Sequence, residues 1–156
     1  MLPEQYTKMS IVTAPAAKID NTSASTTEID TKGYDYAQFL VVVGDMTADL
    51  TALAITESDS SGTGHSNVTG AVFGTSTNSA GSTSSLPAAT DDNKIFIVDL
   101  ALTGRKRYLD VTCTVGTGSS ADGDYITILC RLSRAEETPN TASERGVTQL
   151  LRVPAY

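Results

Sequence analysis

The chain has 156 residues and carries 11 Lys and Arg against 18 Asp and Glu, which gives a formal net charge of −7. This length predicts a single compact domain. The acidic balance argues against nucleic acid as a partner, because neutralising phosphates requires clustered Lys and Arg, and the densest basic run is 105–107. The chain also holds 23 Thr and 16 Ser, which favour strands and turns respectively.

The sequence shows neither a targeting segment nor a membrane span. The first residues, Met-Leu-Pro-Glu-Gln, lack the basic stretch followed by an apolar one that a secretory signal has. The longest apolar run, Phe39 to Val43, is far short of the roughly 20 residues that a membrane helix needs. We therefore expect a protein that is synthesised in a cytoplasm and has no membrane partner.

The first elements in chain order predict an arm followed by two strands. Residues 1–24 are polar and contain Pro3 and Pro15, so we expect an N-terminal arm with a short β-like patch at 10–13. Residues 36–45 are nearly continuously apolar, which predicts a central strand covered on both faces. Residues 48–56 follow as a strand, although their Ala and Leu content also suits a short helix.

The composition changes in the middle of the chain. Between 57 and 93 the residues are mostly Ser, Thr, Gly, Asn and Asp, which predicts a long surface loop with one short strand around Val72 and Phe73. We expect the few apolar residues of this loop to hold it against a sheet while its hydroxyl groups stay in water. These anchors are Val68, Val72, Phe73 and Leu86.

Three further strands complete the predicted domain. Residues 94–102 are mostly apolar, and residues 107–115 and 125–132 alternate apolar with polar side chains. Residues 116–124 have the composition of a hairpin loop, and 135–156 form a C-terminal tail with a β-like patch at 147–153. The predicted fold is all-β: an antiparallel β-sandwich or jelly roll over 25–134, with extended N- and C-terminal arms.

The two cysteines, Cys113 and Cys130, both fall in the apolar phase of their strands. If these strands pair as a hairpin, one register places the two thiols opposite each other. The simpler interpretation is two buried thiols that act as small hydrophobic side chains. Two cysteines are too few for a disulfide scaffold or a structural zinc site.

No residue pattern predicts catalysis. A solvated loop histidine is the preferred interpretation of His65, because no oxyanion pocket accompanies it and Glu57 and Asp59 lack a recognised metal-ligand spacing. Residues 116–121 match the dinucleotide fingerprint, but a strand follows them where that mechanism needs a helix. We therefore expect no enzyme, no cofactor and no metal.

Three segments resemble small proteins encoded among the head genes of tailed bacteriophages. They are 30–44, which begins Asp-Thr-Lys-Gly-Tyr-Asp, 53–59, which ends Glu-Ser-Asp, and the strand that begins Arg107-Tyr108-Leu109. The resemblance implies a capsid decoration (cement) protein: a trimeric structural protein of the virion that lies on the outer capsid surface and bridges major capsid subunits. The apolar runs at 39–43 and 95–102 also favour a symmetric interface between copies.

The arms are the expected means of attachment to the capsid. Each β-like patch can add a strand to the edge of a partner's sheet, and arginines can pair with capsid carboxylates. The residues predicted to bind the partner are Ile11, Val12, Arg145, Leu150 and Arg152. The competing interpretation is that both patches complete the protein's own sheets.

Two alternative functions stay open on the sequence. One is another virion component, such as a head fibre base, a tail tube or a head-tail completion protein. The other is a carbohydrate-binding β-sandwich module, which would be expected to present aromatic platforms, whereas this chain has no Trp.

Overall fold

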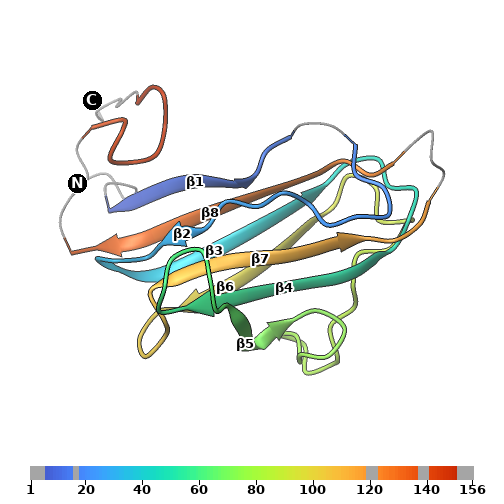
Figure 1. The fold of residues 1–156 in the computed structure, drawn as a ribbon, viewed down its shortest axis with the longest axis horizontal. Helices are drawn as coiled ribbons and strands as arrows, with labels where there is room; N and C mark the ends of the chain where they lie inside the picture. The colour runs from blue at the N-terminus through green and yellow to red at the C-terminus, as the bar shows by residue number, and fades with distance from the viewer. Residues whose placement is uncertain (1–5, 16–17, 119–122, 137–140, 151–156) are drawn as a thin grey trace.

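A computed structural model describes residues 6–15, 18–118, 123–136 and 141–150, which contain eight strands and no helix. The strands form two antiparallel four-stranded sheets, β1-β8-β3-β6 and β2-β7-β4-β5 (Figure 1). The prediction of an all-β antiparallel sandwich is confirmed. The strands are β1 (Thr7–Thr13), β2 (Ile29–Asp30), β3 (Tyr34–Val43), β4 (Leu50–Ser58), β5 (Ser66–Val72), β6 (Ile95–Ala101), β7 (Tyr108–Val115) and β8 (Ile126–Ala135).

The core lies between the two sheets, because alternate side chains of each strand point to the same face. In β3, Phe39, Val41 and Val43 are almost fully buried, whereas Leu40 and Val42 between them are only half-buried. The expectation that this strand is covered on both faces is therefore wrong for the single chain. The largest fully buried side chains come from both sheets and include Phe39, Leu53, Ile55, Leu109, Ile128 and Leu132.

The connections mostly cross from one sheet to the other. Of the consecutive strand pairs, only β4 and β5 are neighbours in one sheet. In particular, β7 pairs with β4 and β2, whereas β8 pairs with β3 and β1. The hairpin predicted at 116–124 is therefore wrong, and that segment joins two sheets.

Much of the predicted N-terminal arm belongs to the sandwich. Residues 7–13 form β1, which pairs with β8 from Thr7 opposite Ser133 to Thr13 opposite Ile128. Further along, residues 19–24 follow the end of β7, where the Ala24 N–H donates to the Cys113 carbonyl over 2.8 Å. Residues 7–13 and 19–24 therefore contact the two sheets directly.

The middle loop is shorter than its composition predicts. Residues 57 and 58 complete β4, and 66–72 form β5, a longer strand than the one expected around Val72 and Phe73. Val68 is fully buried, and Phe73 and Leu86 pack against the core from outside it. Most of the Ser and Thr side chains between 74 and 85 are exposed, as predicted.

Candidate functional site

The outer face of the β1-β8-β3-β6 sheet carries a row of apolar side chains that crosses all four strands. The strand register places Ile11 opposite Leu129, Leu129 opposite Leu40, and Leu40 opposite Ile97. The side chains of Ile11 and Ile97 are 56% and 51% exposed. Ile95, two residues before Ile97 on β6, is 59% exposed. We call Ile11, Leu129, Leu40 and Ile97 the apolar row. Water covers this row in the isolated chain, which is typical of a surface that contacts another protein.

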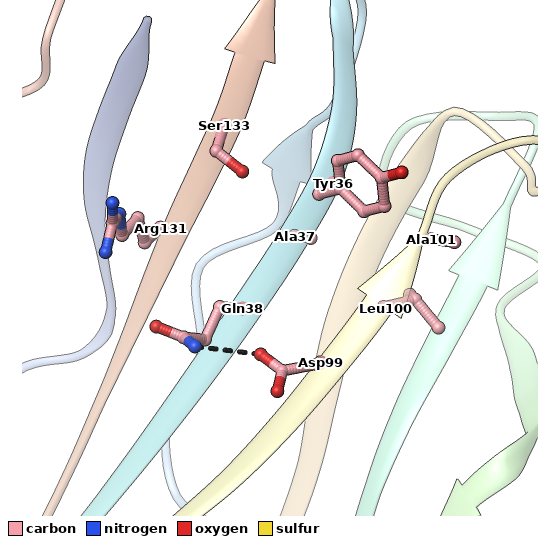
Figure 2. A pocket seen from close by; sticks show the side chains of 8 residues that line it. All are labelled: Tyr36, Ala37, Gln38, Asp99, Leu100, Ala101, Arg131 and Ser133. Carbon is pink, nitrogen blue, oxygen red and sulfur yellow. Dashed lines mark hydrogen bonds between the residues drawn. The ribbon is translucent and has the colours of Figure 1, made fainter. Parts of the chain in front are cut away.

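A band made of polar side chains on β8, β3 and β6 and of Met9 on β1 runs parallel to the apolar row, two residues away from it on each strand. We call it the polar band. Met9, Arg131, Gln38 and Asp99 are register partners in that order across the sheet. Figure 2 shows the Gln38 side chain pointing to Asp99, and the Gln38 Nε2 donates to Asp99 Oδ1 over 2.8 Å. This bond fixes the amide and the carboxylate as one unit at the border of the apolar row.

The polar band borders a shallow depression of about 390 Å³ on the same face. Tyr36, which is 42% exposed, stands over it beside Ala101, with Ser133 on the neighbouring strand (Figure 2). The Arg134 guanidinium lies 5.6 Å from the centre of the Tyr36 ring. The face therefore combines an aromatic ring, hydrogen-bonding groups and an apolar row.

Of the predicted partner-binding residues that the structure describes, Ile11 alone lies on this face. Ile11 belongs to the apolar row, whereas Val12 is 2% exposed and points into the core. Successive side chains of a strand point to opposite faces, so Val12 lies on the core side of β1 while Ile11 lies on the outer side. Leu150 is half-buried outside any strand, and Arg152 lies outside the described residues.

Arg145 binds the protein's own first strand. Its Nη2 donates to Thr7 Oγ1 over 2.9 Å and its Nε donates to the Thr7 carbonyl over 3.3 Å. The Arg145 carbonyl in turn accepts the Met9 N–H over 2.8 Å. The guanidinium predicted to reach a capsid carboxylate is therefore engaged within the chain, and the tail covers part of the β1 edge.

His65 is not the solvated loop residue that its neighbours in the sequence suggest. Its side chain is 18% exposed, and its Nε2 lies 3.0 Å from Glu28 Oε2. Ser61 Oγ and the Gly62 N–H also donate to the Glu28 carboxylate, at 2.6 and 2.8 Å, and these bonds lower the pKa of Glu28. Because the Ser61 hydroxyl bonds the carboxylate and not the imidazole, the cluster lacks the nucleophile–base contact of a catalytic triad.

Asp124 is a buried residue at the end of the segment whose composition predicts a hairpin loop. It is completely buried, and its Oδ1 accepts the backbone N–H groups of Thr47 and Ala48 over 2.6 and 3.2 Å. These bonds hold the turn before β4 against the chain that leads into β8. A Gly-Asp pair directly before an apolar strand was the available signal, but it does not reveal the distant partner.

The two thiols are free and lie in different sheets. Cys113 is the register partner of Leu53, and Cys130 is the register partner of Phe39. Burial raises the pKa of each thiol to about 12. The hairpin register that would place them opposite each other is wrong, and the interpretation as small buried hydrophobic side chains fits the structure.

Comparison with protein-family models, with curated proteins and with solved structures finds no match for this chain. Within the part of the chain that the structure describes, no helix is long and apolar enough to cross a membrane. In the same residues, no cluster of three or more His, Cys, Asp or Glu side chains is placed to hold a metal ion. The apolar row and the polar band are therefore the strongest candidate functional surface.

Proposed function

We propose that this chain is a structural protein of a tailed-phage virion, a capsid decoration protein that binds the outer capsid surface and bridges major capsid subunits. The observation that supports this function best is the strand order. The strand orders of the two sheets are β1-β8-β3-β6 and β2-β7-β4-β5, and nearly every connection crosses between the sheets. This is the arrangement expected of a jelly roll. That architecture recurs in viral capsid proteins.

The apolar row supplies the contact surface in this proposal. Its exposed isoleucines lie on the outside of a sheet whose inner face already fills the core. A decoration protein gains affinity when many copies each make modest contacts, because oligomer formation turns later attachments into nearly intramolecular events. We also propose a homotrimer, which covers apolar surface that a monomer leaves in water.

Co-sedimentation with empty heads of the encoding phage tests the role. The wild-type chain is expected to sediment with the heads, and Ile11→Lys is expected to reduce the bound fraction about tenfold, since it places a charge in the apolar row. Thr112→Lys is the matched control, because Thr112 is exposed on the other sheet. Failure of the wild-type chain to sediment with heads would overturn the decoration role.

Mass photometry of the free chain tests the trimer. The expected result is a mass of three chains for the wild type and for Thr112→Lys. A monomer across the micromolar range would rule out the trimer without deciding whether the chain binds heads.

The depression beside Tyr36 favours one second candidate, a carbohydrate-binding module. An exposed aromatic ring next to a fixed amide and carboxylate is a combination that can stack on and hydrogen-bond a sugar. A glycan array with the wild type and Tyr36→Ala separates this candidate from the decoration role. Binding that depends on Tyr36 would favour the module, and an empty array would remove it.

A further inference from the structure

Within the part of the chain that the structure describes, the backbone groups on the outer edge of β6 have no hydrogen-bond partner. The Val43 N–H donates to the Lys94 carbonyl and the Leu102 N–H donates to the Asp35 carbonyl, at 3.0 and 2.8 Å. Because antiparallel pairs alternate, even-numbered residues of β6 exchange hydrogen bonds with β3. The N–H and C=O groups of Ile95, Ile97 and Asp99 therefore point away from β3, towards the free edge.

A groove runs beside this free edge. It has a volume of about 490 Å³, within the range of ligand pockets, and Ile97, Val98 and Asp99 line one side of it. The end of β5 and polar residues between 76 and 84 line the other side. Ser84 is one of these polar residues.

The groove carries negative charge on its β6 side and no charge on the facing side. Asp99 is its single charged lining residue, and the facing segment, residues 66–90, contains no charged side chain. The exposed side chains of Ile95 and Ile97 stand on the adjoining sheet face. An occupant that matches these surroundings has backbone groups for the strand edge, apolar side chains for the isoleucines and a basic residue at the Asp99 end.

We propose that this groove binds an extended peptide segment of a partner protein, which adds to β6 as a fifth strand of the β1-β8-β3-β6 sheet. Backbone hydrogen bonds to Ile95, Ile97 and Asp99 supply affinity, and alternating apolar side chains with one basic residue supply register. The binding mode stands independently of the virion proposal and depends on it only for the identity of the partner, which would then be a capsid subunit.

A peptide fits the groove better than a second copy of the sandwich. The polar wall from 76 to 84 stands beside β6, so the space at the edge is bounded on the side of the other sheet. An added strand fills that space, whereas two whole sandwiches joined β6 to β6 would bring both walls together.

An array of acetylated heptapeptides tests the proposal with the full chain. Alternate positions hold Val, Ile, Leu or Thr, and one end holds Arg, Ala or Glu. We expect peptides with Arg to bind best and to protect the Ile97 and Asp99 amides from hydrogen exchange. Ile97→Pro removes one outward N–H without removing a bond to β3, and Ile97→Ala removes the side chain but keeps that N–H. Proline is expected to bind about tenfold more weakly than alanine.

Three results would overturn the proposal. One is that no peptide in the array protects the two amides, and another is that Ile97→Pro and Ile97→Ala bind equally well while both remain folded by circular dichroism. The third is concentration-dependent protection in the protein alone, which would identify a second copy as the occupant. Co-sedimentation with heads separates this inference from the virion role: wild-type sedimentation that Ile97→Pro retains excludes only a capsid subunit as the partner at this edge, and absent wild-type sedimentation overturns only the virion role.

Discussion

The two edge strands of one sheet, β1 and β6, differ in how their outward backbone groups are covered. On β1, the Met9 N–H donates to the Arg145 carbonyl and the Val12 carbonyl accepts the Thr27 N–H, each over 2.8 Å. These partners come from the C-terminal tail and from the segment before β2. Among the described residues, the outward backbone groups of β6 receive no such cover, and two of its isoleucines are more than half exposed.

This difference shows which edge the chain itself protects. An uncovered edge strand with apolar side chains is a template for another strand, and proteins usually block it with charges, proline or covering segments. Two segments that are distant in the sequence cover β1, whereas β6 has no proline and a single charged residue, Asp99, within Ile95–Ala101. An edge left open beside a groove is consistent with use by a partner.

The largest expected effect tests how firmly β1 belongs to the fold. Val12→Asp should lower the free energy of unfolding by about 3 kcal/mol or more, because it places an unpaired carboxylate in the core. Ile11→Asp is the matched control and should cost less than about 1 kcal/mol, since Ile11 is 56% exposed. Urea denaturation measures both. Equal effects would mean that β1 is a detachable arm after all.

The cover on β1 can be removed without touching β1. Gly146 has a φ of +69°, and a Cβ there would collide with the Met9 carbonyl oxygen. Gly146→Ala should therefore cost about 1–2 kcal/mol and speed exchange of the Met9 amide. Gly81→Ala is the control, since Gly81 has a φ of +82° but open space around it. If both variants lose the same stability, the tail does not protect the edge.

Blocking β6 should affect association far more than stability. Ile97→Lys places a charge on an exposed site of the open edge, so the free energy of unfolding should change by less than about 0.5 kcal/mol. Binding of the array peptides that carry Arg should be about tenfold weaker than to the wild type, because lysine is a natural edge blocker and repels the basic residue. Thr112→Lys adds the same charge on the other sheet and should leave peptide binding unchanged. A similar decrease in both variants would point to net charge as the cause.

The smallest expected effect is a pH dependence at the cover of β1. Hydrogen bonds from Ser61 and Gly62 lower the pKa of Glu28, so its stabilising contribution is present above its usual pKa and is lost as the pH falls through the lowered value. Glu28 follows Thr27, which covers the Val12 carbonyl. Hydrogen exchange should therefore show the Thr27 and Gly62 amides losing protection below about pH 4. This loss should be less steep in Glu28→Gln than in the control variant Asp59→Asn. Equal pH dependence in the two variants would rule out Glu28 as the cause.

Strand positions could be predicted from the sequence because alternation is a local property. The strands predicted at 36–45, 94–102, 107–115 and 125–132 all appear within a few residues of their expected bounds. For 48–56, antiparallel pairing with β7 from Leu50 to Ser58 shows a strand and not the short helix. The polar composition of 74–85 likewise predicted its exposure.

Which strands become neighbours was not predictable in the same way. The segment 116–124 has the composition of a hairpin, yet the strands on either side of it enter different sheets, because each finds better partners far away in the chain. The same failure affected the candidate site: Ile11 and Val12 look equivalent in the sequence, and Arg145 looks like a free cation until Thr7 is placed beside it.

The sequence by itself therefore determined the all-β class, most strand positions and the acidic, hydroxyl-rich surface, since composition and period-two alternation act over a few residues. Only the tertiary structure decided that β1 is an integral edge strand, that the two thiols lie apart and that β6 has a free edge beside a groove. Those features arise from pairings between residues distant along the chain, where the gain of burying both sheets' apolar faces, not local preference, selects the partner.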